Sequence, residues 1–363
     1  MIEIPDRKAT VAISFDYETS ANSHNIVSSN IVMKNILQLR NFFLKDKKDI
    51  SLVFGRGYSN RIGTENIISV FQKYKIHGTW FSTGHVLLKE NIHRNNYRIH
   101  KQSSYPAIFK GLNNINNPGQ PEHPVFMDDP AGDYKTHPYW YFGDQAQRLR
   151  EMGEDIQCHT FSHPYVALEA VENLQTDLED WQKAAARNGF EKATVLAFPY
   201  LGDCYIQNKI TGETGMFRNL TEKNPEAFDI LPLSGKHIDI LKSAGIELVT
   251  RCISWQMKND FLFGGIREYN YSGLYYMPDI NFSMPEFNNL AFKTFLGEVI
   301  VRHATLNIWL HPNNVFRTGE IRNFEKMVCA LKEESDKGNI WLATMKEIWE
   351  KFKTDNNLRK LSL

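Results

Sequence analysis

Short apolar runs rich in strand-forming residues alternate with amphipathic segments along most of the chain, and this alternation constrains the fold more than any other feature. The runs that we expect to form strands are residues 9–16, 78–84, 154–160, 193–200, 246–254, 306–312 and 340–345. The segments that we expect to form helices are residues 63–76, 143–153, 173–189, 235–245 and 323–338. Strands that alternate with helices form parallel sheets with the helices outside. The pattern therefore predicts an α/β fold, either an open sheet or a barrel.

Two stretches interrupt the alternation, at about residues 90–136 and 201–227. Neither has clear periodicity, and the first is rich in Asn, Pro, Gly, His and Lys. Long loops inside a compact domain are usually functional or without fixed structure. We interpret both stretches as insertions over the mouth of a functional site, within one domain that spans residues 1–363. A surface excursion without fixed structure is the alternative for each.

Reactive side chains stand at the ends of four predicted strands. They are Asp16, His159, Tyr200 and His311. In open parallel sheets and in barrels, functional groups collect where the strands end. The four positions therefore predict one shared site.

The stretch "DIQCHTFSHP" places His159 and His163 four residues apart. On a helix this spacing puts both rings on one face, as in zinc proteases. Here the residue after the first histidine is Thr160 and Pro164 follows the second, so a strand leading into a turn fits better. The pair either holds a metal ion or consists of ordinary hydrogen-bonded histidines.

The first strand ends in "SFDYE", with Asp16 and Glu18 two residues apart. Residues with this spacing on an extended chain project to the same side. One carboxylate can complete a three-ligand metal set with the histidines, as in catalytic zinc sites with an open position, while the other accepts a proton. Solvated acids at a strand end are the alternative.

Five motifs occur in the order found in polysaccharide deacetylases of the NodB-like, carbohydrate esterase family 4 group: "ISFDYE", "GTWFSTG", "GEDIQCHTFSHP", "AFPYLG" and "IWLHP". The chain resembles this family from Ala9 to about Phe352, apart from the two insertions. The resemblance implies a distorted (β/α) barrel and a divalent metal ion, most often zinc. It also implies a carbohydrate substrate and removal of an N-acetyl group.

The roles of the family's metal ligands and catalytic residues are assigned to the residues of this chain that stand at the same motif positions. The family's first motif has two adjacent aspartates, a base and a ligand, whereas Tyr17 occupies the second place here. Some members separate the acids by one residue, and this chain looks like them. The resemblance then implies Asp16 as general base and Glu18 as metal ligand, together with His159 and His163.

Two further roles follow from the later motifs. The resemblance implies that His311 is the general acid, and that the backbone N–H of Tyr200 stabilises the oxyanion. We expect the His311 side chain to reach the site from the side opposite Asp16.

The chain departs from the family at one charged pair. Many members have R-x-P-Y where this chain has Ala197-Phe198-Pro199-Tyr200, so their arginine is absent. Its aspartate partner is also not evident near "TRCISWQ". Loss of both partners is coherent, because loss of one leaves a buried charge uncompensated. Arg251 is a candidate substitute for the positive group.

Aromatic residues are candidates for sugar binding. The stretch "HPYWYF" offers Tyr139, Trp140 and Tyr141 for stacking on a pyranose ring, or forms a turn that packs its own aromatic rings. Trp80 and Trp255 are expected in the core or in the wall of the site.

Composition excludes some classes of protein. Lys and Arg total 42 and Asp and Glu total 42, which argues against broad nucleic-acid binding. No apolar run is long enough to predict a membrane span, and the first residues lack a secretion signal. The four cysteines form no C-x-x-C pair. We therefore expect reduced thiols and a cytoplasmic location.

Three classes of function remain open. The first is a metal-dependent N-deacetylase that acts on an amino sugar in a polysaccharide or a glycan precursor. The second is a hydrolase of a non-sugar C–N bond, such as a cyclic ureide or imide, because relatives with the same fold cleave these. The third is a non-catalytic carbohydrate-binding protein on this scaffold, and the retained Asp16, histidine pair and His311 argue against it.

Overall fold

The structure is a computed structural model of the 363-residue chain. It describes residues 8–19, 47–92, 132–212, 214–216, 227–252, 265–269 and 272–354. Trp255 lies outside these residues, as do most of the first insertion and part of the second.

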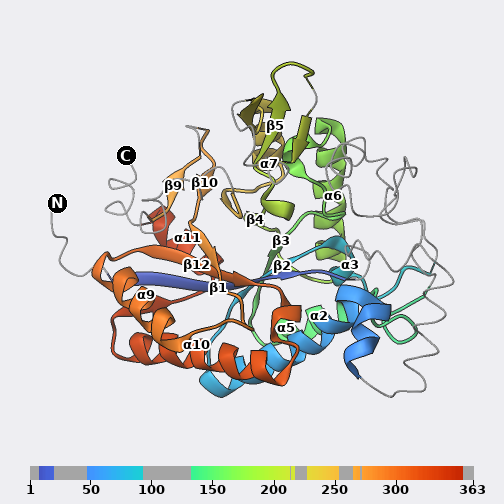
Figure 1. The fold of residues 1–363 in the computed structure, drawn as a ribbon. Helices are drawn as coiled ribbons and strands as arrows, with labels where there is room; N and C mark the ends of the chain where they lie inside the picture. The colour runs from blue at the N-terminus through green and yellow to red at the C-terminus, as the bar shows by residue number, and fades with distance from the viewer. Residues whose placement is uncertain are drawn as a thin grey trace.

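A largely parallel sheet forms the centre of the molecule (Figure 1). The strand order is β11-β12-β1-β2-β3-β4-β8-β10-β9, and β13 also pairs with β1. The strands are β1 (Ala9–Tyr17), β2 (Thr79–Ser82), β3 (Asp155–Cys158), β4 (Val195–Ala197), β8 (Leu248–Thr250), β9 (Arg267–Glu268), β10 (Tyr275–Tyr276), β11 (Asp279–Asn281), β12 (Thr305–Leu310) and β13 (Ile340–Leu342). Among these described strands, only the β9–β10 pair is antiparallel.

The predicted α/β class is confirmed, in the form of a barrel that does not close. Within the described residues, β11 and β9 stand at opposite ends of the strand order and do not pair with each other. Strand β1 is third in this order, after β11 and β12. It pairs with β12 along one edge, and with β13 and then β2 along the other.

Helices pack around the sheet. They are α2 (Lys47–Tyr74), α3 (Gly84–Leu87), α5 (Gly143–Glu151), α6 (Val171–Arg187), α7 (Gly235–Ser243), α9 (Asn289–Val301), α10 (Thr318–Asp336) and α11 (Met345–Thr354). In Figure 1, α2 and α10 run beneath the sheet, and α6 and α7 lie at its upper right. The predicted helix 63–76 is the second half of the much longer α2. Helices α9 and α11 were not expected from the sequence.

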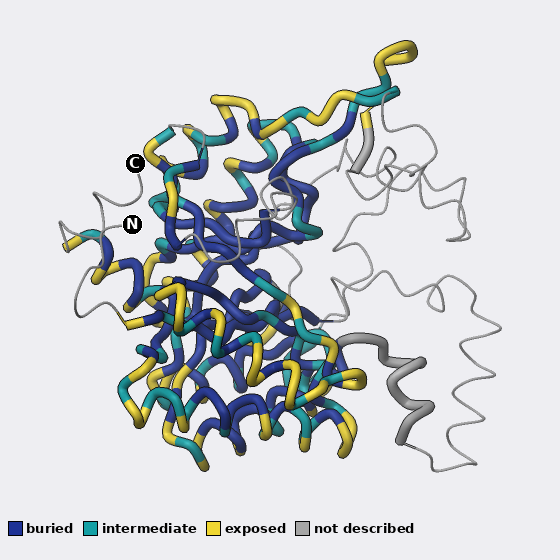
Figure 2. The backbone as a smooth tube through the Cα atoms, turned by 60° about the vertical axis from the view of Figure 1, so that its left-hand side comes forward, coloured by how far each residue is buried: buried dark blue, intermediate teal, exposed yellow. Residues whose placement is uncertain are grey.

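Alternation along β1 divides the core in two. Val11, Ile13, Phe15 and Tyr17 join the main hydrophobic cluster, in which residues of α2, α6 and α10 take part. Ala12 belongs to a second cluster with residues of β2, β4, β8 and α11. The residues on the Ala12 side therefore face the interior of the open barrel. Figure 2 shows buried segments at the centre of the molecule and exposed segments at the periphery.

The described part of the second insertion is not a featureless loop. Strands β5 (Cys204–Asn208) and β6 (Thr214–Met216) of this insertion form a separate antiparallel sheet with β7 (Phe228–Pro232), which directly follows it, in the order β6-β5-β7. Residues 93–131 of the first insertion lie outside the described residues, and Glu90 forms an isolated bridge with Asp133 at their base. A position of either insertion over the site stays a prediction.

None of the helices in the described ranges combines the length and apolarity needed to cross a membrane. All four cysteines are free, and three of them are buried.

Candidate metal and catalytic site

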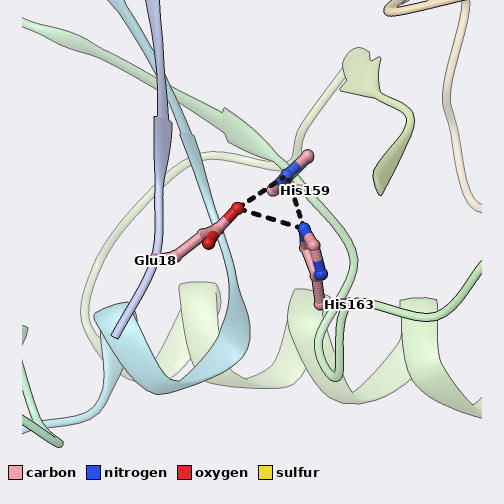
Figure 3. A group of neighbouring side chains, drawn as sticks. All are labelled: Glu18, His159 and His163. Atoms are coloured by element: carbon pink, nitrogen blue, oxygen red, sulfur yellow. Dashed lines mark hydrogen bonds and ion pairs between the residues drawn. The ribbon is translucent and has the colours of Figure 1, made fainter. Parts of the chain in front are cut away.

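Glu18, His159 and His163 converge on one point at the ends of β1 and β3 (Figure 3). The Oε1 atom of Glu18 lies 3.1 Å from Nε2 of His163 and 3.7 Å from Nε2 of His159. The two Nε2 atoms are 3.1 Å apart. All three side chains are buried. The structure therefore brings together the three residues that the sequence predicted as ligands.

The backbone fixes which nitrogen of His159 faces this point. Its Nδ1 atom lies 2.9 Å from the carbonyl oxygen of Ala197, at the end of β4. A carbonyl oxygen only accepts, so Nδ1 donates, and in the neutral ring Nε2 carries the lone pair. Such a bond to the far nitrogen is the usual way in which proteins orient a metal-binding histidine.

The spacing of the three atoms fits a metal ion. Tetrahedral zinc with bonds of about 2.0–2.1 Å places its ligand atoms about 3.3–3.4 Å from one another. The observed distances of 3.1, 3.1 and 3.7 Å fall on both sides of that value. Two buried imidazoles and a carboxylate also match the ligand types that zinc prefers. The residues present therefore fit a divalent ion of this kind.

A buried aspartate shapes the turn that carries the histidines. Asp177, in the middle of α6, accepts from the backbone N–H of Phe161 at 2.5 Å and of Ser162 at 2.9 Å. It also accepts from the Ser162 hydroxyl. The expected strand and turn are confirmed, because β3 ends at Cys158. The role of Asp177 escaped the sequence analysis, since an acid within a helix carries no distinctive signal.

Backbone strain is concentrated around the site. Seven non-glycine residues of the described chain have positive φ, and five lie in segments that build the site. These five are Thr160, His163, Tyr200, Leu201 and Arg251. Left-handed backbone is unfavourable for residues with a Cβ atom and tends to occur at functional sites.

Asp16 and Glu18 lie on the same side of β1, as their spacing predicted. Tyr17 between them points into the main core, where it is fully buried and its hydroxyl donates to Oε1 of Gln145 at 2.9 Å. Burial raises the pKa of this phenol, which therefore stays protonated. Tyr17 occupies the family's second aspartate position without taking over the ligand's function.

Asp16 forms a buried ion pair with Arg251, which follows β8. Nη2 of Arg251 lies 2.9 Å and Nε lies 3.2 Å from Oδ1 of Asp16. The guanidinium also stacks over the ring of Trp309, 4.4 Å from its centroid. Burial by itself would raise the pKa of Asp16, but the charge of Arg251 and the neighbouring histidines outweigh it, and the pKa is lowered.

Asp279, on β11, contacts both the backbone and the guanidinium of Arg251. Its Oδ2 atom accepts from the Arg251 backbone N–H at 2.5 Å and from the Thr250 hydroxyl at 2.5 Å. It lies 3.7 Å from Nη1 of Arg251. Burial raises the pKa of Asp279, and this effect outweighs the charge of Arg251 and the hydrogen bonds that would lower it.

The charged pair is absent from its motif positions, as the sequence indicates, but Arg251 and Asp279 supply a buried arginine and a buried carboxylate in the same region. Arg251 supplies the arginine from β8, the strand next to β4: Thr250 is the register partner of Ala197, where the family has its arginine. Asp279 supplies a carboxylate from β11. Arg251 was a candidate in the sequence, but Asp279 was missed because it lies 28 positions further along the chain.

His311 follows β12, and its Nε2 atom lies 3.5 Å from Oε1 of Glu18. The expectation that it reaches the site from the side opposite Asp16 is wrong. Strand β12 pairs directly with β1, with Leu310 opposite Phe15, so His311 and Asp16 come from adjacent strands. The side chain is 21% exposed, more than the three candidate ligands.

Tyr200 lies in the short helix η3 (Pro199–Leu201) with φ of 58°. Its ring contacts that of His163, with centroids 4.5 Å apart. The residue thus lies beside the candidate ligands, as the motif order implied.

The aromatic stretch before α5 packs mainly against the protein. Tyr141 is fully buried, so the interpretation of this ring as a stacking surface for sugar is wrong. Trp140 is half-buried against the main core, and Tyr139 packs on Tyr58 with centroids 5.2 Å apart. Trp80 is fully buried in the core, as expected.

Residues 44–216 match the family model for polysaccharide deacetylase, which confirms the resemblance over the segment that contains the second, third and fourth motifs. A search of curated proteins gave no match. Among solved structures, a candidate polysaccharide deacetylase from Mycobacterium smegmatis matches with a TM-score of 0.52 and 11% identity. The match covers 100% of this chain and 94% of that one. At this identity the likeness shows a shared fold alone.

Two other solved structures are more distant. The Xyl-CE4 domain of a multidomain xylanase from the hindgut metagenome of Trinervitermes trinervoides has a TM-score of 0.41 at 9% identity, over 96% of this chain and 94% of that one. A peptidoglycan deacetylase from Bacillus subtilis has a TM-score of 0.40 at 11% identity, over 99% and 98%. At these TM-scores, neither likeness supports a conclusion about this chain.

Proposed function

We propose that the chain, of which residues 44–216 match the family model for polysaccharide deacetylase, is a metal-dependent hydrolase that removes an N-acetyl or similar acyl group from an amino sugar. The observation that carries the proposal is the convergence of Glu18, His159 and His163 beside Asp16 and His311. Three candidate ligands, a buried carboxylate and a partly exposed imidazole can serve as metal site, general base and general acid in a metal-dependent amide hydrolysis.

Glu18, His159 and His163 would hold the ion, and their donor types favour zinc. When bound, a divalent ion supplies positive charge that polarises the acyl oxygen and acidifies water. The orientation of His159 by the Ala197 carbonyl and the close contact of His163 with Glu18 support this ligand set.

Asp16 would act as general base. It takes a proton from the attacking water, and for this it has to be ionised. Arg251 keeps the carboxylate charged by lowering its pKa, and through two N–H groups it holds the carboxylate in one orientation. The same contacts support the role of Asp16 as a base rather than as a ligand.

His311 would act as general acid. An amine leaves poorly unless it is protonated, and the exposed edge of the His311 ring can deliver that proton. The backbone N–H of Tyr200 would stabilise the oxyanion. The position of this residue beside His163 is compatible with the role.

The substrate class can be tested on protein stripped of metal with a chelator and then loaded with Zn²⁺. We expect acetate release from N-acetylglucosamine oligomers or from nucleotide- or lipid-linked N-acetylhexosamines, and no release from the stripped protein. Hydrolysis of a cyclic ureide or imide in place of these would establish the second class of function. Sugar binding with tight metal binding but no hydrolysis of any acyl substrate would establish the third.

The cytoplasmic location expected from the sequence is also a proposal. Fractionation of cells expressing the native gene product tests it, with recovery outside the cytoplasm as the contrary result.

A further inference from the structure

Glu18 and His311 both lie beyond the regular hydrogen-bonding of their strands. The register between β1 and β12 ends with the pair Phe15 and Leu310. The sheet by itself therefore does not fix the distance between the carboxylate of Glu18 and the ring of His311. Since these groups lie 3.5 Å apart, another element has to hold the two strand ends together.

The side chain of Asn60, on α2, contacts both strand ends. Its Nδ2 donates to the backbone carbonyl of Glu18 at 2.8 Å. Its Oδ1 accepts from the backbone N–H of Asn313 at 2.8 Å. Asn313 belongs to η7 (Pro312–Val315), the turn that directly follows His311. One fully buried carboxamide thus joins the Glu18 backbone to the segment that carries His311.

The packing of α2 makes this contact rigid. A Cβ atom on Gly63 would lie 1.8 Å from the carbonyl oxygen of Pro312, so the helix backbone rests directly on η7. The Thr64 hydroxyl donates to the Asn60 carbonyl and is buried with it. A hydrogen bond within the segment also stabilises η7, since the His311 N–H donates to Oδ1 of Asn314 at 2.8 Å. A movement of the Asn60 amide would therefore shift both strand ends.

We propose that Asn60 is a positioning residue that sets the separation between Glu18 and His311. The proposal rests on the function proposed above, in which Glu18 binds the ion and His311 protonates the leaving amine. Asn60 itself touches neither ion nor substrate. It acts through the Glu18 carbonyl and the Asn313 N–H.

The test compares Asn60→Ala with Asn66→Ala. Asn66 lies on the same helix, and its Nδ2 donates to the carbonyl of Val315 at 2.8 Å, at the far end of η7. Both changes remove an amide contact between α2 and η7, but only Asn60 reaches Glu18. Three quantities are measured on each protein: Zn²⁺ affinity by chelator competition, the ratio of N-acetyl amide to aryl acetate hydrolysis, and the melting temperature.

For Asn60→Ala we expect Zn²⁺ affinity to fall about 10-fold or more, the usual scale for residues that orient ligands. The amide-to-ester ratio should fall as well, because only the amide needs a correctly placed acid. Asn66→Ala should lower the melting temperature without changing either quantity. Equal affinity and equal ratios in the two variants would overturn the proposal.

Asn60→Asp separates the two contacts and serves if the alanine variant does not fold. A carboxylate still accepts from Asn313 but cannot donate to the Glu18 carbonyl. Zn²⁺ affinity should fall while the amide-to-ester ratio stays near that of the unaltered protein. The added negative charge attracts the cation, so it opposes the expected loss and cannot cause it. Asn66→Asp adds the same charge to the same helix, so equal Zn²⁺ affinities in the two aspartate variants would contradict the link to Glu18.

Failure of the proposed function gives a different result. In that case the unaltered protein shows no amide hydrolysis at all, whereas the affinity comparison between the variants still reports on the position of Glu18.

Discussion

Arg251 and Asp16 form an ion pair inside the barrel, with Nη2 of the arginine 2.9 Å from Oδ1 of the aspartate. The arginine follows β8 and the aspartate lies on β1, two strands that do not pair with each other. Asp279 supports the arginine from β11. The positive charge of Arg251 is therefore held beside the proposed base by residues from three separate strands, β1, β8 and β11.

Replacement of Arg251 should destabilise the protein severely. Arg251→Met leaves Asp16 and Asp279 buried without a cation, and loss of one partner from such a site typically costs about 3–5 kcal/mol. Urea unfolding of the metal-free protein measures the change. Arg251→Met combined with Asp279→Asn should recover part of the loss, because one of the two uncompensated charges is gone. A double variant less stable than Arg251→Met would contradict this account of the pair.

Replacement of His159 should abolish metal binding. We expect about one divalent ion per chain in the loaded protein and far less in His159→Ala, because a ligand is missing. Elemental analysis after gel filtration measures the content. His237→Ala is the matched control, since His237 is also buried and its Nε2 contacts the backbone carbonyl of Glu169 away from the ligands. Undiminished metal in His159→Ala would refute the ligand assignment.

Asp16→Asn should separate metal binding from chemistry. The ion should remain, because Glu18 and the two histidines are intact. Deacetylation should fall about 10²-fold or more, the usual scale for a positioned proton-transfer group. Metal content and kcat are measured on the same preparation. If this variant loses its metal as completely as His159→Ala, Asp16 is a ligand and the roles of Asp16 and Glu18 have to be exchanged.

His311→Ala should affect amides more than activated esters. An amine needs a proton in order to leave, whereas an aryl oxide departs with little help. We expect a severe loss on an N-acetyl substrate and much retained activity on an aryl acetate. Asp16→Asn provides the comparison, because removal of the base should slow both reactions. Equal losses on the two substrates in His311→Ala would indicate a role in substrate positioning or in stabilising the oxyanion.

Asp177→Ala should loosen the histidine turn. It leaves the buried N–H groups of Phe161 and Ser162 without their carboxylate, and each unsatisfied donor costs about 1–3 kcal/mol. We expect a lower free energy of unfolding and weaker Zn²⁺ binding, since His163 lies in this turn. Glu172→Ala, in the first turn of the same helix, is the control and should leave Zn²⁺ binding unchanged. Unaltered Zn²⁺ affinity in Asp177→Ala would show that the turn holds its shape without the carboxylate.

The sequence allowed prediction of those parts of the site that depend on local pattern. Alternation along β1 placed Asp16 and Glu18 on one side, and the short spacing with Pro164 placed His159 and His163 in a turn. The family motifs predicted that His311 and Tyr200 belong to the site. The alternation of strands and helices predicted the parallel sheet.

Contacts between distant segments were not predictable in this way. Asp279 and Asp177 act across the fold on backbone groups, and neither stands in a pattern that distinguishes it from an ordinary acid. The position of His311 relative to Asp16 depends on which strands are neighbours, and the order of the strands along the chain does not determine this. The antiparallel strands β5, β6 and β7 were not predicted, because the stretch that contains β5 and β6 was interpreted as an insertion without clear periodicity.

The position of Tyr17 restricts how the first strand can change over evolution. Its ring is fixed in the core, while the residues on either side face the site. Insertion or deletion of one residue in β1 would exchange the two faces and turn Asp16 and Glu18 toward the hydrophobic side. This segment can therefore diverge by substitution, but a single-codon insertion or deletion there would remove the proposed base and a ligand in one step.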